Sequence, residues 1–299
     1  MFNGFSHSVK GASHKASGTV CQDSSAYLAE ERYAVAVVAD GHGSKKHFRS
    51  NIGSEFAVNC TIETVKRFYR NPEEFENNFP KNHKMVIRNI QKQIISAWNI
   101  KVAGHFKTNP VTPEEKSKFT ADEFAKISVE SYYGTTLVAA VACKGFTFGF
   151  QIGDGSLVAV FDDGETNMLI DYEESNPANI TSSICNNNAA SMFDSFYIEN
   201  KRVFALYAST DGLYTSFGSD NDFLDYHTII TSQLREAGMF ESAVIKNLKK
   251  RSNFGTQDDI SLSCIYDKDL INSRMDVIMK KIEENKQRQI AEKAKLIDG

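Results

Sequence analysis

The chain has 299 residues, 41% of them hydrophobic, which is enough to bury a large core, and we expect one large domain rather than two. Its 34 basic and 38 acidic side chains give a formal net charge of −4 without a dominant block of either sign, so a nucleic-acid-binding surface is not expected. The five cysteines are scattered without a Cys-x-x-Cys pair, which argues against a disulfide framework or a zinc site and favours reduced thiols.

The amino terminus lacks a basic region followed by an apolar stretch, which a secretory signal would need. No segment approaches about eighteen consecutive apolar residues, the length of a membrane-spanning helix. We therefore expect a cytoplasmic protein without a membrane partner.

The first elements in chain order are a strand and two helices. Residues 33–39 form a short run rich in valine, which indicates a buried strand, and we take it as the first strand of the fold. Apolar residues recur at helical spacing over 49–69 and over 84–103, so each segment predicts an amphipathic helix that covers a sheet. Between them, 71–80 is polar and contains two prolines, which is typical of a connector.

The next segment, 107–131, is more polar still and is expected to be a surface insertion. Within it, Thr112-Pro113-Glu114-Glu115 combines a capping box with proline at the first helical position, which predicts a short helix. Two interpretations stay open. The insertion is a lid or partner contact, or it is a solvated loop without a role, which chain entropy tolerates easily.

Strand patterns then follow one another closely. Residues 136–142, 146–152 and 157–161 each predict a strand, and their short connections require antiparallel pairing, because a parallel crossover needs about a dozen residues or more. The alternating phenylalanines of 146–152 are expected to pack in the core rather than to form a cofactor platform. Asp162-Asp163-Gly164-Glu165 is expected to be a hairpin turn and not a metal ligand.

The last third of the chain alternates loops, strands and helices. We expect loops over 171–200 and 212–218, strands over 203–209 and 260–266, and helices over 220–238, 242–251 and 275–296. The last of these helices is charged and has only a thin apolar stripe. We expect it to pack on the domain, with contact to a partner as the alternative.

Acidic residues recur where apolar runs end. One run stops at Asp40-Gly41-His42-Gly43, which places an oxygen ligand and a titratable ring at a sheet edge, although Asp-Gly is also a common tight turn. Asp154, Asp211 and Asp258-Asp259 also adjoin apolar runs, and Gln22-Asp23 precedes the 33–39 run. Carboxylates that converge in one cleft repel one another unless cations lie between them. The sequence therefore predicts a divalent metal site.

Six motifs occur in a fixed order over roughly residues 5–266. They are Gly11-Ala12-Ser13-His14 with Cys21-Gln22-Asp23, Ala39-Asp40-Gly41-His42-Gly43, Gly134-Thr135-Thr136, Ile152-Gly153-Asp154-Gly155-Ser156, Ala208-Ser209-Thr210-Asp211-Gly212-Leu213 and Gly255-Thr256-Gln257-Asp258-Asp259-Ile260-Ser261. This order resembles the metal-dependent serine/threonine protein phosphatases of the 2C type, in particular a bacterial branch with Gln-Asp rather than Glu-Asp near the start.

The resemblance implies an α+β fold, a four-layer α-β-β-α sandwich of two mainly antiparallel sheets flanked by helices. The phosphatase domain would span residues 1–270, with the insertion at 107–131, and the charged C-terminal helix would occupy 271–299. The implied partner is a phosphorylated protein substrate, and we expect a monomer.

The resemblance also assigns metal ligands, residue by residue. It implies that Asp40 bridges two divalent ions, that the Gly41 carbonyl ligates one of them, and that Asp211 and Asp258 complete the shell of the first ion. Asp154, together with Asp211, would hold a third ion more weakly. Because all of these donors are oxygen atoms, Mg²⁺ or Mn²⁺ fits better than zinc.

The implied reaction is direct hydrolysis of the phosphate ester. Two cations would lower the pKa of a shared water, so that a metal-bound hydroxide attacks phosphorus in line without a phosphoenzyme. His42 is implied as the acid that protonates the leaving serine or threonine alkoxide. The alternative for His42 is a loop histidine that is satisfied by a neighbour.

The chain departs from the family pattern at its acidic corners. Gln22 stands where many members have a glutamate that binds the second ion through water, and its uncharged amide oxygen can still accept a hydrogen bond. Asp23 beside it would compensate directly or through water. Asp259 stands where the family often has asparagine, so Asp258 is the expected ligand.

A second departure concerns the substrate phosphate. His14, flanked by Lys15, stands nearest to the arginine that usually binds this group, and Lys45 and Lys46 are candidates to replace it. A histidine would bind phosphate best when protonated.

Three functions follow from these patterns. The first is a phosphoprotein phosphatase, which the acids Asp40, Asp211 and Asp258 favour. The second is a catalytically weak relative that serves as a binding or regulatory module, which Gln22 and His14 keep open. The third is a metal-dependent hydrolase of small phosphate esters or nucleotides. Neither a P-loop nor a Gly-x-Ser-x-Gly elbow occurs in the sequence.

Overall fold

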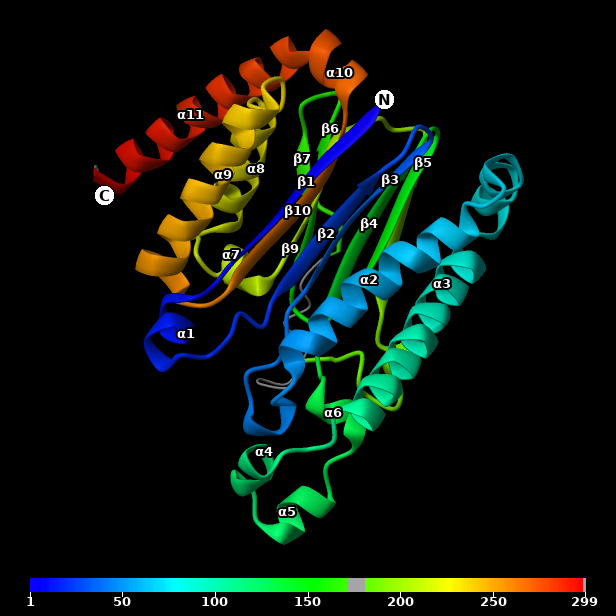
Figure 1. Cartoon of the computed structure of the whole chain (residues 1–299). Coiled ribbons are helices and arrows are strands. Elements are labelled where there is room, and N and C mark those ends of the chain that lie inside the picture. Colours follow the sequence, from blue (N-terminus) through cyan, green and yellow to red (C-terminus); the bar gives the residue numbers. More distant parts are fainter. Residues whose placement is uncertain (171–180, 298–299) are drawn as a thin grey trace.

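The computed structural model describes residues 1–170 and 181–297. Two five-stranded sheets pack face to face, and helices cover both outer faces (Figure 1). The strand order is β2-β3-β4-β5-β8 in one sheet and β1-β10-β9-β6-β7 in the other, and all pairs are antiparallel. The expected four-layer α-β-β-α sandwich is confirmed.

The strands of the first sheet are β2 (Ser24–Ala29), β3 (Tyr33–Ala39), β4 (Leu137–Cys143), β5 (Phe146–Ile152) and β8 (Asp194–Glu199). Those of the second are β1 (Phe2–Val9), β10 (Ile260–Asp267), β9 (Val203–Ser209), β6 (Ser156–Phe161) and β7 (Thr166–Met168). All six predicted strands are present with ends within one residue of the expected ones. Residues 162–165 form the expected turn, which joins β6 to β7.

Four strands, β1, β2, β7 and β8, were not among the predicted ranges. The expectation that 33–39 is the first strand is wrong, because β1 and β2 precede it, and part of the expected 171–200 loop is β8. Most positions of β1, β2 and β8 are only half-buried or exposed, so these strands carry polar residues and lack the apolar run that marks a buried strand. Residues 171–180 of that expected loop lie outside the described residues.

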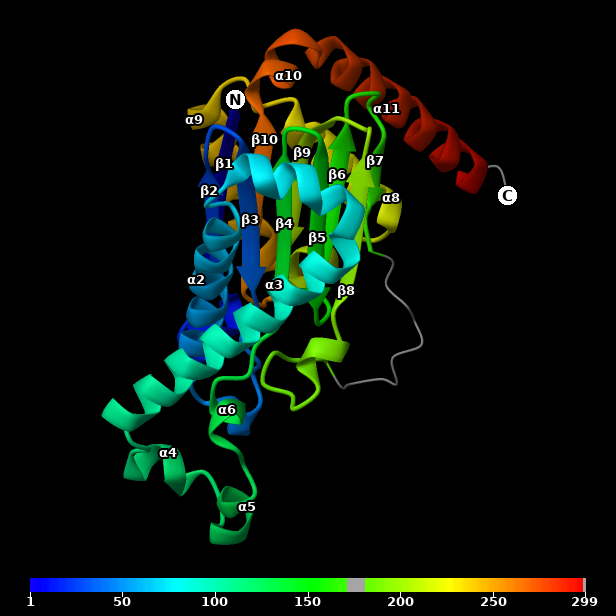
Figure 2. The same ribbon diagram turned by 90° about the vertical axis from the view of Figure 1, so that its right-hand side faces the viewer.

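Helices α2 (Ser50–Phe68) and α3 (Pro72–Thr108) cover the first sheet (Figure 2). The helix expected at 49–69 is confirmed, but the connector expected over 71–80 is wrong, because α3 already begins at Pro72. The Asn71 side chain caps this end by accepting from the Glu74 amide, and Pro72 occupies a first-turn position that suits proline. Pro80 lies inside the helix, which bends at Asn82, where φ is −128°.

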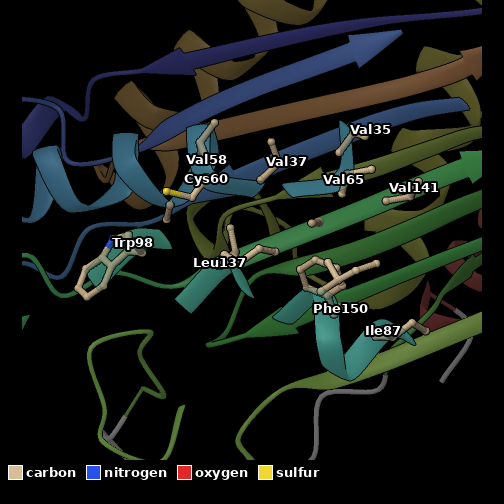
Figure 3. Close-up of a cluster of buried hydrophobic side chains, with 14 of the residues drawn as sticks. Val35, Val37, Val58, Cys60, Val65, Ile87, Trp98, Leu137, Val141 and Phe150 are labelled. Atoms are coloured by element: carbon tan, nitrogen blue, oxygen red, sulfur yellow. The ribbon is translucent and has the colours of Figure 1, made fainter. Parts of the chain in front are cut away.

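The core beneath these helices sets how closely α2 packs on the sheet. Figure 3 shows side chains of α2 and α3 packed on those of β3, β4 and β5: Val35, Val37, Val58, Cys60, Val65, Ile87, Trp98, Leu137, Val141 and Phe150. Trp98 is fully buried and donates from Nε1 to the Gly53 carbonyl at 2.9 Å. A Cβ on Gly53 would lie 1.8 Å from the Tyr133 carbonyl oxygen, so only glycine permits this close approach.

The helices on the other outer face are α8 (Asp220–Thr231), α9 (Ala237–Arg251) and α11 (Met275–Ile297), and the short helices α7 (Asp211–Tyr214) and α10 (Lys268–Ser273) adjoin them in sequence. The three expected helices are confirmed with shifted ends, whereas the loop expected at 212–218 begins with the helical turn α7. The last helix packs on α8, and Ile278 is fully buried. Among the described residues, no helix combines the length and apolar character needed to span a bilayer.

The remaining helices lie near one end of the sandwich. They are α1 (Ala12–Ser17) and the insertion helices α4 (Pro113–Ser117), α5 (Ala121–Ala125) and α6 (Val129–Tyr132). The expected capping box is present, with Thr112 and Glu115 bonded reciprocally. Figure 1 shows the insertion extending past the ends of the strands. All five cysteines are free thiols, as expected.

Candidate metal and phosphate site

Four acidic corners meet at one edge of the sandwich. Asp40 directly follows β3, and Asp154 follows β5 after one glycine; both strands flank β4 and therefore run in the same direction. Asp211 follows the end of β9, and Asp258 precedes the start of β10, its antiparallel neighbour. Antiparallel pairing places the end of one strand beside the start of the next. The topology therefore gathers acids that are up to 218 positions apart, from 40 to 258, in one pocket.

The pocket has a volume of about 270 Å³ and receives most of the predicted site residues. Its lining consists of His14, Gln22, Asp40, Gly41, His42, Gly43, Thr136, Asp154, Thr181, Asp211, Asp258 and Asp259. No lysine or arginine of the described chain is among these residues. The pocket is therefore dominated by carboxylates.

The Asp40 backbone is held rigidly by the Gly134-Thr135-Thr136 motif. The Asp40 amide donates to Thr136 Oγ1 at 3.0 Å, and the Asp40 carbonyl accepts from the Thr136 amide at 2.8 Å and from Thr135 Oγ1 at 2.7 Å. The Gly41 amide donates to the Gln22 carbonyl at 3.2 Å. A Cβ on Gly41 would lie 2.7 Å from that same oxygen, so glycine is needed here.

The carboxylates disturb one another electrostatically. Burial, followed by the charges of Asp23 and Asp211, raises the pKa of Asp40 well above its usual range. Burial, followed by the charge of Asp154, raises the pKa of Asp211 to about 6. Asp211 Oδ1 is buried and has no hydrogen-bond partner among the described residues. Such a group is costly to bury unless a counter-charge satisfies it.

The donor set fits a hard divalent cation. No three His, Cys, Asp or Glu side chains of residues 1–170 and 181–297 converge closely enough to enclose an ion by themselves. Magnesium, however, commonly keeps several waters and uses only one or two carboxylates. Asp40 and Asp211 lie within hydrogen-bonding reach of each other, and the Gly41 backbone lines the same pocket. Two adjacent carboxylates, one of them with an unsatisfied oxygen, meet that requirement.

Gln22 and Asp23 differ in their placement. The Gln22 Nε2 group donates to Ser50 Oγ at 2.6 Å and to the His42 carbonyl at 3.2 Å, which leaves its amide oxygen as the free acceptor at the pocket wall. Asp23 does not line the pocket. It is buried behind it and accepts from Thr210 Oγ1 at 2.8 Å. A direct contact of Asp23 with an ion in the pocket is therefore not supported.

His14 lies in the pocket with its ring beside Asp259, although its Nδ1 makes no hydrogen bond to another described residue. His14 Nδ1 lies 3.0 Å from Asp259 Oδ2, and Asp259 accepts from the backbone amides of Gly11 and Gln22, each at 2.6 Å. Asp259 therefore ties the α1 segment to the start of β10, whereas Asp258 is exposed at the pocket rim.

The alternatives to His14 lie outside the pocket. Neither Lys45 nor Lys46 is among its lining residues, and Lys45 pairs with Glu123 of the insertion at 2.8 Å. The structure therefore does not bring either lysine into the predicted phosphate-binding position.

His42 is held by its backbone and presents a free ring nitrogen. Its amide donates to the Gly134 carbonyl at 3.1 Å, and its ring centroid lies 4.9 Å from that of His47. His42 Nε2 is buried and has no hydrogen-bond partner among the described residues. Burial, followed by the positive charges of His47 and Lys46, lowers the pKa of His42 to about 4. The ring is therefore neutral near pH 7 in the free protein.

Sequence reasoning gave no role to three threonines of the site. Thr136 and Thr210 belong to the recognised motifs, where their hydroxyls accept from the Asp40 amide and donate to Asp23. Thr181 donates to Asp154 Oδ2 at 2.9 Å from the polar segment before β8. Nothing in the local pattern around Thr181 distinguishes it from other polar loop residues.

Comparison with known proteins agrees with this arrangement. The family model described as protein phosphatase 2C matches residues 10–250. Among solved structures, the chain is similar to the serine/threonine phosphatase Stp1 from Staphylococcus aureus, with 15% identity, a TM-score of 0.55 and coverage of 90% of this chain and 96% of that one. It is also similar to PppA from Pseudomonas aeruginosa, with 16% identity, a TM-score of 0.55 and coverage of 89% and 97%.

A third solved structure is the serine/threonine phosphatase PstP/Ppp of Mycobacterium tuberculosis, with 11% identity, a TM-score of 0.52 and coverage of 89% and 98%. At these identities the solved structures establish the fold alone. No curated protein matches the chain in sequence.

Proposed function

The chain belongs to the protein phosphatase 2C family and is a protein phosphatase, and from this premise we propose that it hydrolyses phosphoserine and phosphothreonine with the help of bound Mg²⁺ or Mn²⁺. The observation that carries the proposal is the pocket itself. Carboxylates from four separate corners line it without any lysine or arginine of the described chain, and they occupy the positions of the family motifs.

We assign the cation ligands as follows. Asp40, the Gly41 carbonyl, Asp211 and Asp258 would hold two divalent ions, and Asp154 with Asp211 would hold a third. The buried and unpartnered Asp211 Oδ1 supports this assignment, because a cation would satisfy it. When bound, such ions lower the pKa of coordinated water and neutralise charge on the phosphate.

The protein's own groups position that chemistry. The Thr135 and Thr136 hydroxyls fix the Asp40 backbone, and Thr181 orients the Asp154 carboxylate by donating to it at 2.9 Å. Ligands that are held before substrate arrives need little reorganisation during the reaction. The Gln22 amide oxygen would accept a hydrogen bond from water in the pocket.

We assign proton donation to His42 and a phosphate contact to His14. His42 Nε2 has no partner among the described residues and lines the pocket, where it could give a proton to a leaving alkoxide. Its low pKa means that it must first gain a proton, and a phosphate dianion beside the ring raises the pKa in that direction. His14 is a weaker candidate for the phosphate contact, because its Nδ1 lies 3.0 Å from the Asp259 carboxylate, whose negative charge would repel a phosphate.

The domain limits also belong to this proposal. We place the phosphatase domain at residues 1–270, because β10 pairs with both β1 and β9 in its sheet and lies beyond residue 250. The 107–131 insertion is part of it, and the charged segment 271–299 is appended to it, with α11 packed on α8. We retain a monomer that acts on phosphorylated proteins as our expectation.

A catalytically weak binding module is the less favoured alternative. A module would not need to retain a buried carboxylate without a partner, since that group lowers stability when no cation is bound. Hydrolysis of small phosphate esters has no specific observation in its favour.

The test is turnover of a phosphothreonine peptide by the purified chain with Mn²⁺. We expect activity that chelator abolishes and that Asp40→Asn lowers at least about a hundredfold, the usual effect of removing one preorganised electrostatic group. Asp163→Asn is the matched control, because Asp163 lies in the β6–β7 turn and pairs with Lys201 far from the pocket lining. Activity that survives both chelator and Asp40→Asn would rule out the proposed mechanism.

A further inference from the structure

The 107–131 insertion is bound directly to the segment that follows His42. This segment, residues 43–49, connects the acidic corner at Asp40 to α2. Lys45 pairs with Glu123 at 2.8 Å and lies over the Phe119 ring at 5.3 Å, and the Phe48 ring packs against Phe119. The insertion is therefore packed against the rest of the protein. It rests on the loop that carries a proposed catalytic group.

Arg49 is the centre of this attachment. Its side chain is only 7% exposed and makes five hydrogen bonds, all of them to the insertion or its borders. Two go to the Glu115 carboxylate at 2.8 Å each, and the others go to the carbonyls of Asn109 at 2.6 Å and Pro110 at 3.1 Å and to the Tyr133 hydroxyl at 3.0 Å. A planar guanidinium suits this forked arrangement better than an ammonium does.

A second set of contacts continues from the insertion to His42. The end of α6 approaches His47, whose Nδ1 contacts the Ser131 carbonyl, and the Arg49 amide donates to the Tyr132 carbonyl at 2.8 Å. The His47 ring in turn packs against the His42 ring, at 4.9 Å between centroids. A Cβ on Gly134 would lie 2.4 Å from His47 Nδ1, so only glycine at this position lets the His47 ring pack this closely against the end of the insertion.

We propose that the insertion holds His42 in position, and we call this arrangement the clamp. Arg49 and Glu115 anchor the insertion to residues 43–49, and the packing of the His47 ring on the His42 ring passes this restraint to His42. Arg49 is thus a positioning residue, since it does not line the pocket. This inference rests on the proposed function, in which His42 protonates the leaving group. It answers the question that the sequence left open, because a solvated loop without a role would not engage a buried arginine through five bonds.

The readout that isolates His42 is the dependence of turnover on the leaving group. p-Nitrophenolate is a weak base and departs without a proton, whereas a threonine alkoxide is a strong base and needs one. A displaced His42 therefore slows the phosphothreonine peptide and spares p-nitrophenyl phosphate. A general loss of stability or of metal binding would slow both substrates together.

The experiment compares kcat for the two substrates, with Mn²⁺, in Glu115→Gln, Arg49→Lys and the wild-type chain. We expect the ratio of peptide turnover to p-nitrophenyl phosphate turnover to fall at least about tenfold in both variants, since a small misplacement of a catalytic group can cost up to about a hundredfold. Glu115→Gln keeps the size of a partly exposed side chain and so remains informative if Arg49→Lys does not fold.

Two further variants make the result decisive. His42→Asn shows how far the turnover ratio falls when the proposed acid is removed entirely. Glu76→Gln is the matched control, because the Glu76 carboxylate accepts two hydrogen bonds from the Arg32 guanidinium, as Glu115 does from Arg49. Arg32 directly precedes β3 and Asp40 directly follows it, so this pair lies at the other end of the strand. The turnover ratio of Glu76→Gln should stay at the wild-type value.

Each remaining outcome counts against a specific claim. If His42→Asn lowers the ratio but Glu115→Gln and Arg49→Lys do not, the clamp is refuted and the proposed function stands. If His42→Asn slows both substrates equally, the acid role of His42 is wrong and the clamp has nothing to position. A wild-type chain that hydrolyses neither substrate would overturn the proposed function itself.

Discussion

Single residues in the pocket carry unfavourable electrostatic energy. Burial raises the pKa of Asp40 and Asp211 in the pocket and of Asp23 behind it, and the charges of neighbouring carboxylates raise these pKa values further. No lysine or arginine of the described chain lines the pocket to offset this repulsion. Charge neutralisation at one of these residues should therefore stabilise the metal-free protein even as it removes a ligand.

We predict that Asp211→Asn raises the free energy of unfolding in the presence of chelator by the order of 1 kcal/mol, because one of several neighbouring like charges disappears. Denaturant unfolding at neutral pH measures this change, with Asp163→Asn as the surface control. A metal-free Asp211→Asn protein that is clearly less stable than wild type would show that Asp211 serves mainly as a structural acceptor.

His227 gives the fold a dependence on pH outside the pocket. It is fully buried in α8, its Nδ1 lies 2.8 Å from the Phe223 carbonyl, and burial lowers its pKa from 6.5 to about 4. Above pH 6.5 the ring is neutral in both the folded and the unfolded state. Below that value the unfolded chain takes up a proton that the folded chain still refuses, so stability falls as the pH drops from 6.5 towards 4.

The corresponding measurement is the free energy of unfolding at pH 7 and pH 4.5 for wild type and His227→Asn. The wild-type chain should lose up to about 3 kcal/mol more than the variant over this interval, since one pKa unit corresponds to about 1.4 kcal/mol. Equal losses in the two proteins would mean that His227 does not contribute to the acid sensitivity.

At the scale of elements, α11 shows how a weak apolar stripe can still determine packing. Its Ile278 is fully buried and Ile282 is 9% exposed, whereas Ile290 on the same helix is 61% exposed. The Arg288 guanidinium donates to both oxygens of the buried Asp225 of α8, at 2.8 and 2.7 Å. Three buried apolar side chains, those of Met275, Ile278 and Ile282, therefore attach a helix that is otherwise charged, together with the bonds of Arg288 and Gln289 to Asp225.

Ile278→Ala should therefore lower the free energy of unfolding by about 2 to 5 kcal/mol, the range for truncating a buried isoleucine to alanine. Ile290→Ala is the matched control and should have little effect. Denaturant unfolding monitored together with hydrogen exchange on α11 would check both. If Ile278→Ala leaves both unchanged, α11 does not contribute to the stability of the domain.

At the scale of the whole molecule, the pocket joins the two sheets. Asp40 and Asp154 extend from the sheet that contains β3 and β5, and Asp211 and Asp258 extend from the sheet that contains β9 and β10. Any cation held by both groups therefore binds the folded sandwich and not its separated sheets. Metal binding and global stability should be coupled for this reason.

We predict that Mn²⁺ raises the Tm of the wild-type chain in a saturable way, with about 2.7 kcal/mol of added stability at a concentration one hundred times the dissociation constant. Asp40→Asn should lose most of this shift, and Asp163→Asn should keep it. Thermal unfolding followed by circular dichroism across a Mn²⁺ titration measures the effect. An equal shift in all three proteins would place the bound metal somewhere other than the pocket.

The sequence predicted elements well wherever burial leaves a periodic pattern. The valine run of β3 and the alternating phenylalanines of β5 were placed correctly because both strands are buried along their length. The pattern failed where local composition and tertiary environment disagree. Residues 71–80 contain two prolines and look like a connector, yet Phe75 and Phe79 bury into the core and hold the segment in a helix. The half-exposed strands β1 and β2 were missed because their polar residues leave no apolar run in the sequence.

The sequence by itself determined which side chains are available for chemistry. Its acids adjoin apolar runs in the order of the family motifs, and the chemistry of an oxygen donor does not depend on where the chain places it. The tertiary structure alone decided which of them meet. It brought Asp40, Asp154, Asp211 and Asp258 to one pocket, left Asp23 behind the wall, and fixed the insertion to the loop beside His42 through Arg49. These outcomes depend on strand pairing and on contacts between distant segments, which are set by the packing of the whole chain and leave no mark on its local pattern.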